Sequence, residues 1–458
     1  MPTLTEKAGT GLNSISSPRS NDLTKGIIWK QLLKFSAPLV LSSFLQSFYG
    51  IADMIIAGHF IGPNGLSAAN NSSSIMTFVT FVILGLCTGG GVLIGQYFGA
   101  GDRAKCKHAV TTLFTFTMVF GALLSILLMA AAKPLLVSIR APVLEDATSY
   151  LRICASGSIF IAGYNAANAA MRSVGNSRAP LICVLVSCLL NVVLDIVFTG
   201  FLGMGVDGLA LATVFSQGAS FVLALCIVLR DRELYGLKLT KLYIRIDELK
   251  TMLKLGIPVS IQLTVAHISW FAALYLLNGY DVFVSAGNGV SMKIRDFCLL
   301  LIFSMANGAT AMIAQNIGAK EYERVRKVMF CAMRISLCVA ISLIAAVEAL
   351  APQLVSIFTS EANTAAAAVR NLRIEILSQV IYAVLLMYHA LGLGSGHTMY
   401  VLFSSFVNSL LVRIPLIFLL NHYVGLDGIY IGLMIAPLSS IPVGIWYERS
   451  NRWRKHRL

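Results

Sequence analysis

Two aspartates lie inside stretches of the sequence that are otherwise apolar. Asp53 belongs to the segment YGIADM at 49–54, and Asp195 ends the segment LNVVLD at 190–195. An ionisable side chain at the centre of a bilayer costs about 2.5–3.5 kcal/mol on insertion scales, so each acid is a candidate functional residue. Asn191 lies four residues before Asp195, so on a helix both side chains project from one face. Thr213, in the middle of the next apolar stretch, adds a hydroxyl.

These four side chains offer the hard oxygen ligands that small cations prefer. Together, Asp53, Asn191, Asp195 and Thr213 are a candidate site for Na⁺. Alternatively, the two acids share one proton, because two like charges held close resist ionising together. A structural role is the third interpretation, in which the polar groups hydrogen bond between helices and one acid stays protonated. The spacing favours a cation-coupling site.

The composition indicates which elements must position these residues. Of 458 residues, 57% are hydrophobic and only 12% are charged, about half the charged fraction of a soluble domain. A helix needs about 20 apolar residues to cross a bilayer. Twelve runs of sufficient length are predicted, at about 32–58, 70–97, 108–132, 148–171, 180–202, 206–229, 250–277, 285–314, 327–350, 366–391, 398–420 and 428–447. The sequence therefore predicts an all-α, polytopic membrane protein.

The second half of the chain repeats the first after about 220 residues. The segment GQYFGA at 95–100 returns as AQNIGA at 314–319, and GVDG at 205–208 returns as GLDG at 425–428. Six spans per copy is an even number, so both copies enter the membrane from the same side. We expect two parallel six-helix lobes that face each other across a cleft able to open to either side.

Basic residues gather in alternate connections, as the positive-inside rule requires of cytoplasmic loops. They lie at 7–30, 103–107, 230–254, 320–327 and 449–457. This distribution accounts for the net charge of +14 without a nucleic-acid partner. It predicts a multi-pass protein of the plasma (inner) membrane with both termini in the cytoplasm.

The predicted boundaries follow from the spans and the polar segments between them. They are a cytoplasmic N-terminal arm at 1–31, a first lobe at 32–230, a cytoplasmic linker at 231–249, a second lobe at 250–447 and a basic cytoplasmic tail at 448–458. The first 24 residues are polar and rich in serine, so a disordered arm is expected there rather than a cleavable signal.

The second lobe carries a different set of polar residues. At the repeat offset, Asp53 falls on Ala273, and Asp195 falls near Ile414 or Pro415. A purely architectural role would favour acids in both copies, so the coupling site is expected in the first lobe alone. Candidates for a substrate cleft are Tyr49 and Gln46 in the first lobe and His267, Lys293, Arg295, Asp296 and Arg413 in the second.

Two interpretations of the second-lobe charges stay open. Lys293 and Asp296 are three residues apart, which allows an ion pair on one helix face. A structural pair and a lining of the cleft are the alternatives. Glu348 and Glu375 are expected near the membrane interfaces.

The sequence lacks the usual machinery of an enzyme. No Gly-Lys dipeptide occurs, which excludes a Walker-type phosphate loop, so any pumping must draw on an ion gradient. The nine cysteines are scattered, without a CxxC motif, and are expected to be small packing residues. Gly91, Gly95 and Gly99 recur at every fourth position, a pattern typical of close helix packing.

Three segments together resemble the multidrug and toxic compound extrusion (MATE) transporters, a likeness that extends over almost the whole chain. KFSAP at 34–38 leading to IADMIIAG at 51–58 is similar to the family's first helix with its acid. LIGQYFGAGD at 93–102 is similar to the end of its second span. RSVGNSRAP at 172–180, followed by LNVVLD, is similar to its fourth-to-fifth-span signature. The second copy departs from this signature, since LGLGSGHT at 391–398 lacks the arginine and the proline.

The resemblance implies two six-helix lobes and export of organic cations in exchange for Na⁺ or H⁺. It carries the family's first-lobe cation site onto Asp53, Asn191, Asp195 and Thr213. Some members also have an acid in the seventh span, but 262–278 contains none here. This favours the subgroup whose coupling site lies in the first lobe only.

The sequence thus predicts a secondary antiporter that exports amphipathic, cationic compounds by alternating access of two lobes. The alternative is a flippase for lipid-linked precursors, which Lys293, Arg295 and Arg413 keep open because such a protein needs a basic cleft. No cofactor is expected besides the coupling ion, H⁺ or Na⁺. Expected partners are small organic cations and membrane lipids, without nucleic acid, and the chain is expected to act as a monomer.

Overall fold

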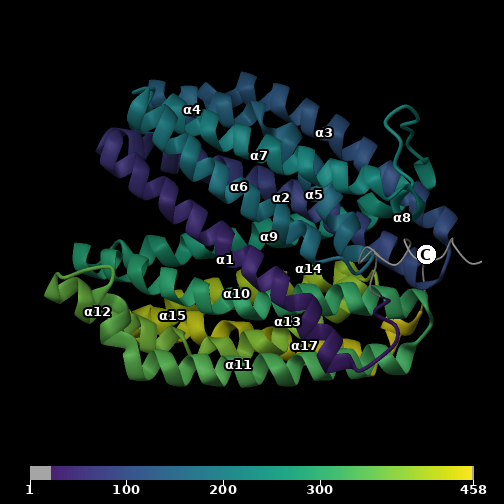
Figure 1. Cartoon of the computed structure of the whole chain (residues 1–458). Coiled ribbons are helices and arrows are strands. Elements are labelled where there is room, and N and C mark those ends of the chain that lie inside the picture. Colours follow the sequence, from purple (N-terminus) through teal and green to yellow (C-terminus); the bar gives the residue numbers. More distant parts are fainter. Residues whose placement is uncertain (1–21, 456–458) are drawn as a thin grey trace, which may run out of the picture.

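The computed structural model describes residues 22–455, which form helices joined by short turns (Figure 1). The predicted arm before residue 22 and the last three residues of the predicted tail lie outside the described residues. Ten helices are each long and apolar enough to cross a membrane, and a pair bent by 45° gives an eleventh span. The fourth predicted span corresponds to a second broken helix, at 144–173, which is interrupted at Gly157. The predicted all-α fold is confirmed.

The helices of the first lobe precede residue 231. They are α1 (Ile28–Phe60), α2 (Pro63–Gly99), α3 (Arg103–Ser138), α4 (Leu144–Ser156), α5 (Ser158–Ser173), α6 (Arg178–Asp195) with the π-helical turn η1 (Ile196–Phe201), and α7 (Gly205–Arg230). The short helix α8 (Arg232–Tyr235) follows in the linker.

The second lobe repeats this order. Its elements are α9 (Ile246–Leu277), α10 (Val282–Gly318), α11 (Tyr322–Ser356), α12 (Ala362–Glu375), α13 (Ser378–Gly394), α14 (Thr398–Phe406), the π-helical turn η2 (Val407–Arg413), α15 (Ile414–Val424), α16 (Leu426–Ile435), the 3-10 turn η3 (Ala436–Ser439), α17 (Ser440–Arg449) and the 3-10 turn η4 (Arg452–Arg454). Helix α9 therefore begins a few residues before its predicted start.

The two copies share their irregularities. The fourth span breaks between α4 and α5 at Gly157, and the tenth bends between α12 and α13 at 376–377, which is the same place at the repeat offset. Pro38 in α1 and Pro258 in α9 also correspond, and each removes one backbone donor from its helix. Gly175 and Gly396 end equivalent helices at φ of 84° and 79°, a conformation that glycine adopts without strain.

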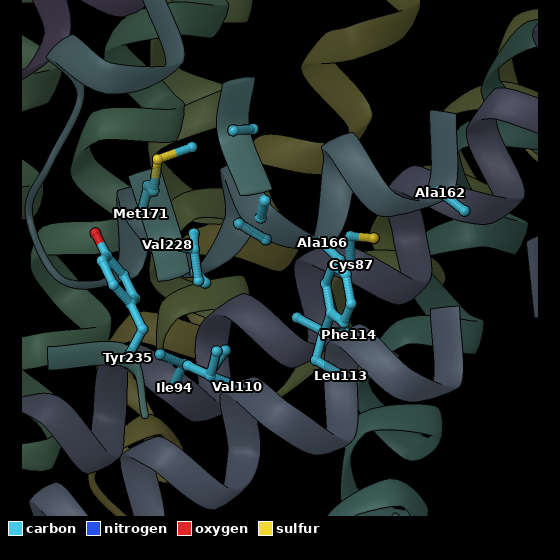
Figure 2. Packing of buried hydrophobic residues seen from close by; sticks show 14 of the residues in the cluster. Cys87, Ile94, Val110, Leu113, Phe114, Ala162, Ala166, Met171, Val228 and Tyr235 are labelled. Carbon is cyan, nitrogen blue, oxygen red and sulfur yellow. The ribbon is translucent and has the colours of Figure 1, made fainter. Parts of the chain in front are cut away.

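Each lobe has its own apolar core. Figure 2 shows part of the first-lobe core, where Leu113 and Phe114 of α3 pack near Cys87 of α2 and Ala166 of α5. The Cys87 side chain is fully buried, as predicted for a packing residue. In Figure 1 the helices α3 to α7 form one group and α10 to α17 the other.

Helices α1 and α9 cross between the lobes. The first turns of α1 pack Leu32 and Phe35 into the second-lobe core, whereas Ala57 near its end belongs to the first lobe. Helix α9 does the reverse, since Met252 packs in the first-lobe core and Leu277 in the second. The two crossing helices thus tie the lobes together.

One end of the bundle, which we call the inner end, carries both described termini and the ends of α2 and α10 (Figure 1). The other is the outer end. At the inner end the lobes are in backbone contact, because a Cβ at Gly99 would collide with the carbonyl of Gln315, and one at Gly318 with that of Gln96. The predicted close packing at Gly99 is thereby confirmed.

Two glutamines fasten the inner end across the repeat symmetry. Gln96 of α2 donates to the carbonyl of Gly394 at 2.9 Å, and Gln315 of α10 donates to the carbonyl of Ser173 at 2.8 Å. Each glutamine thus reaches the last turn of the equivalent helix in the opposite lobe. Gln315 also accepts from the backbone of Leu23 at 3.0 Å, so the segment before α1 is bound to this contact. The lobes are closed at the inner end.

Candidate functional site

The structure brings three of the four predicted cation-site residues together. Asp53 comes from α1, and Asn191 and Asp195 come from one face of α6. With its amide nitrogen turned toward the acids, Asn191 donates to Oδ1 of Asp53 at 2.8 Å and to Oδ2 of Asp195 at 3.0 Å. The two carboxyl groups are also within hydrogen-bonding reach of each other. Asp195 is the last residue of α6, where the helix passes into a π-helical turn, a feature often found at functional sites.

Burial differs across this cluster. Asn191 and Asp195 are both 0% exposed, whereas Asp53 is partly exposed. Within residues 22–455, the Oδ1 atom of Asp195 is buried and has no hydrogen-bond partner. A buried acceptor without a partner is costly, and a proton or a small cation would satisfy it. The donor set therefore fits either coupling ion.

Thr213 is connected to Asp53 through the side chain of Tyr49. Its hydroxyl donates to the carbonyl of Leu209 at 3.1 Å, and the hydroxyl of Tyr49 lies 3.4 Å from it. Tyr49 also reaches the carboxyl group of Asp53. Tyr49, which the sequence placed in the substrate cleft, is therefore the residue that connects Thr213 to the acid.

A cavity of about 1170 Å³ opens beside Asp53 in the outer half of the bundle. Its first-lobe wall includes Gln46 and Tyr49, and its second-lobe wall includes Lys293 and Asp296. Four of the seven predicted cleft residues therefore line one space between the lobes. A volume of this size exceeds that of most small-molecule pockets.

The other predicted cleft residues do not line this cavity. His267 packs edge-on against Phe78 and Phe81 of α2, with ring centroids 5.9 and 5.2 Å away. Arg295 and Arg413 are 6% and 2% exposed, so both lie inside the second lobe. The assignment of these three residues to the outer cavity wall is not supported by the structure.

The two arginines belong to a buried polar cluster in the second lobe. Their guanidinium groups lie 4.3 and 4.9 Å from the ring of Trp270, a cation–π arrangement. Arg413 donates to the hydroxyl of Ser269 at 2.8 Å and to that of Tyr382 at 3.1 Å. We refer to Arg295, Glu375, Arg413 and Trp270 as the second-lobe cluster.

In this region the expectation for Glu375 was wrong, and of the two interpretations of Lys293 and Asp296 the structure favours the lining of the cleft. Glu375 is not at an interface but is 3% exposed and forms an ion pair with Arg295. Lys293 forms no ion pair with Asp296 in the described part of the chain; Asp296 instead lies 3.8 Å from Arg295. The spacing in the sequence suggested an ion pair within one helix. In the structure, Arg295 of α10 instead forms an ion pair with Glu375 at the end of α12.

A second cavity, of about 640 Å³, adjoins the first in the inner half of the bundle. The two spaces share the side chains of Gln46, Tyr49 and Gln217. Arg172, which was not predicted as a site residue, lines the inner cavity. The sequence feature that could have identified Arg172 as a site residue is a basic side chain directly after the apolar fourth span.

The first-lobe site contains carboxyl and amide groups and no imidazole or thiol side chain among Asp53, Asn191 and Asp195. Among residues 22–455, no three His, Cys, Asp or Glu side chains are grouped so as to hold a metal ion. The site combines two carboxyl groups with one amide, whose nitrogen faces the acids, and with the hydroxyl of Thr213, which is reached through Tyr49.

A bundle of two repeated helical lobes, closed at one end and hollow between them, with a polar site on one wall, defines a membrane transporter. The MatE family model matches residues 38–197 and 258–419, one segment in each lobe. The chain belongs to this family, and the resemblance that the sequence suggested is confirmed.

Individual relatives are similar over most of their length. The chain is 28% identical over 425 residues to the probable multidrug resistance protein YoeA of Bacillus subtilis, covering 90% of this chain and 92% of that protein. It is 24% identical to the multidrug export protein MepA of Staphylococcus saprophyticus, with 90% and 91% covered. Its fold matches the outward-facing conformation of a multidrug resistance MATE family transporter with a TM-score of 0.89, 23% identity, and 94% and 97% coverage.

Proposed function

We propose that the protein exports amphipathic organic cations from the cell in exchange for H⁺ or Na⁺. The observation that carries this proposal is the meeting of Asp53, Asn191 and Asp195 at the wall of a large cavity between the lobes. Relatives named as multidrug resistance and multidrug export proteins support the substrate class. The positive-inside distribution of basic residues supports the plasma membrane, with the inner end toward the cytoplasm.

The coupling ion enters from the outer cavity in this mechanism. Asp53 contacts that cavity, whereas Asp195 lies behind it with an unpartnered oxygen, so an ion passes the first acid to reach the second. If the amide of Asn191 turns by 180°, its oxygen takes the place of its nitrogen and faces both acids. Three oxygens then converge on one point and offer part of the oxygen shell that a hard cation such as Na⁺ prefers. With a proton instead, the amide keeps its donating orientation.

Exchange follows from competition for the same negative charge. An organic cation in the cavity is attracted to Asp53, and a bound ion cancels that attraction, so each releases the other. Alternating access requires the inner end to open, which breaks the bonds of Gln96 and Gln315 to the opposite lobe. The helices α1 and α9, which pack in both cores, supply the connection about which the lobes turn.

The flippase alternative has less support. It needs several basic side chains in the cleft, but Arg295 and Arg413 are buried in the second-lobe cluster. Lys293 lines the outer cavity, where it shares the wall with Asp296, and Arg172 lines the inner cavity, so the basic side chains along the cleft are few.

Transport of ethidium by the purified protein in proteoliposomes tests the proposal. We expect a sodium gradient or a pH gradient, each imposed alone, to drive ethidium movement, and Asp53→Asn to abolish it. Asp102→Asn is the matched control, because Asp102 caps α3 at the inner end and asparagine caps helices equally well. Failure of both gradients, or full activity in the Asp53 variant, would show the proposed coupling to be wrong.

A further inference from the structure

A groove on the surface of the second lobe lies between the start of α1 and the first turns of α11, at the inner end (Figure 1). Its volume is about 460 Å³. Helix α1 contributes Ile28 and Trp29, and the side chain of Trp29 is 51% exposed. Helix α11 contributes three basic side chains, Arg326, Lys327 and Arg334. We call this space the α1–α11 groove.

Two positive charges of the α1–α11 groove have no partner among the described residues. Two acids of this region are each already paired with an arginine: Glu448 with Arg326 at 2.6 Å, and Glu323 with Arg454 at 3.3 Å. The other two basic side chains, Lys327 and Arg334, form no ion pair and no side-chain hydrogen bond within residues 22–455. The groove therefore carries positive charge that the described chain leaves unmatched.

One of these charges lies at a depth where lipid tails begin. Arg334 is seven residues inside the span predicted at 327–350, which is about 10 Å at the helical rise of about 1.5 Å per residue. Its side chain is exposed rather than packed inside the lobe. A guanidinium group without a partner is costly next to hydrocarbon, and long basic side chains there extend toward the head groups. An anion at the head-group level would satisfy Arg334.

The first lobe fills its equivalent groove with its own chain. This groove lies between α3 and the start of α9, where Thr112 donates to the carboxylate of Glu248 at 3.1 Å. The linker covers it further, because the hydroxyl of Tyr243 is hydrogen bonded to the ring of His108 and the backbone of Arg245 donates to Thr112 at 3.2 Å. The carboxylate-bearing side chain of Glu248 is thus only 7% exposed.

The second lobe lacks that carboxylate. At the repeat offset, Ile28 takes the place of Glu248, and Lys327 takes the place of His108. Arg334 adds a second positive charge on the same helix. The segment before α1 is bound at the contact between the lobes instead of following the path of the linker. The repeat therefore shows a place where one lobe supplies an anionic group and the other leaves a basic groove open.

The chemistry of the groove suits an anionic phospholipid. Lysine and arginine bind phosphate oxygens through charge-assisted hydrogen bonds, and basic pockets between membrane helices on the cytoplasmic side bind anionic head groups. Trp29 is of the type that marks the head-group level. Toward the outer end, Leu33 of α1 and Ile341 of α11 are 40% and 59% exposed, which gives an acyl chain an apolar path. A free phosphate would use only the charges.

We propose that the α1–α11 groove binds one anionic phospholipid of the inner leaflet, whose phosphate takes the place that the carboxylate of Glu248 occupies in the first lobe. Lys327 and Arg334 contact the phosphate, and the apolar side chains beside them contact the acyl chains. This binding does not depend on the proposed export function.

Native mass spectrometry of the purified protein in detergent tests the proposal. The first bound molecule of palmitoyl-oleoyl phosphatidylglycerol is compared with that of phosphatidylethanolamine with the same chains. We expect the wild type to bind phosphatidylglycerol about tenfold more tightly, because two basic side chains face one anionic head group. The double variant Lys327→Gln with Arg334→Gln should lose this preference, whereas Arg334→Lys should keep it. Glycerol 3-phosphate at the same concentration should not displace the lipid, because it lacks the acyl chains.

Two further variants separate the groove from the general positive charge of the inner end. Lys238→Gln with Lys241→Gln removes the same charge from exposed positions of the linker and should leave the preference unchanged. Ile28→Glu gives the second lobe the carboxylate of the first and should weaken phosphatidylglycerol binding although both basic side chains remain. Thermal melting in detergent shows that each variant is folded, and Ile28→Glu tests the site independently of the double variant.

Several results would overturn the inference. They are a wild type without preference for phosphatidylglycerol, displacement of the lipid by glycerol 3-phosphate, equal losses in the groove and linker variants, or no loss in the folded groove variants.

Discussion

The two lobes use buried charge in opposite ways. In the first lobe, Asp53 and Asp195 meet with only Asn191 between them, and Asp195 retains an oxygen without a partner. In the second-lobe cluster, Arg295 is matched by Glu375 and both guanidinium groups lie against Trp270. One site lacks a positive charge, and the other already contains it.

This difference supports the proposal that the first lobe binds the coupling ion. Two carboxyl groups held close without a counter-charge, one of them fully buried, resist ionising together, so their state depends on whether a cation or a proton binds. The second-lobe cluster also leaves Oε1 of Glu375 and Nε of Arg413 without a hydrogen-bond partner among the described residues, but its acid is paired with an arginine, and removing one member of such a pair is costly. Because the two lobes share one repeat, the comparison sets the proposed functional site beside a buried ion pair at another place in the same fold.

The largest effect is expected from Asp195→Asn. It removes the buried charge while keeping an acceptor for Asn191, so ethidium transport should fall by at least about 100-fold. Thermal melting in detergent should be unchanged or higher, because an unpartnered acid has been removed from the interior. A variant that transports at the wild-type rate, or one that melts much earlier, would contradict the functional assignment of this lobe.

The reverse pattern is expected in the second lobe. Glu375→Gln leaves Arg295 buried without its acid, which should lower the free energy of unfolding by about 3–5 kcal/mol. Glu348→Gln is the matched control, since its ion pair with Arg373 is partly exposed and should contribute at most about 1 kcal/mol. Equal melting temperatures for the two variants would mean that the second-lobe cluster is not structural.

Sequence alone located the first-lobe site because charges in apolar spans are visible one residue at a time. Asp53 and Asp195 stand out against about 20 apolar neighbours, and helical spacing added Asn191. The internal repeat, which is also visible in the sequence alone, predicted the two-lobed fold. Neither inference required knowledge of which helices pack together.

The residues that were misjudged depend on contacts between distant segments. Arg295 and Glu375 are 80 positions apart, so a pairing within one helix looked more plausible than the true one. The bonds of Gln96 and Gln315 join opposite lobes through neutral amides, which have no distinctive signature in a sequence. Long-range side-chain geometry, rather than composition or periodicity, decides such cases.

A smaller effect is expected at the inner end. Gln96→Ala and Gln315→Ala each remove one hydrogen bond that holds the lobes closed, worth about 1 kcal/mol. A cysteine placed at Asn307, on the inner cavity wall, should then react about fivefold faster with a thiol reagent in a background without native cysteines. Gln353→Ala, at an exposed site, should leave the rate unchanged. Equal rates in all variants would mean that the glutamines do not keep this end closed.

The smallest expected effect concerns Thr213. Its hydroxyl is bound to the carbonyl of Leu209 and meets the site only through Tyr49, over a long contact of 3.4 Å. Thr213→Val should therefore change the half-saturating concentration of the coupling ion by no more than about twofold, because a weak hydrogen bond at one remove contributes little. Tyr49→Phe, which removes the hydroxyl next to Asp53, should have the larger effect of the two. A tenfold loss in the Thr213 variant would make Thr213 a direct ligand of the ion, as the sequence suggested, and would extend the ion site from α1 and α6 to α7.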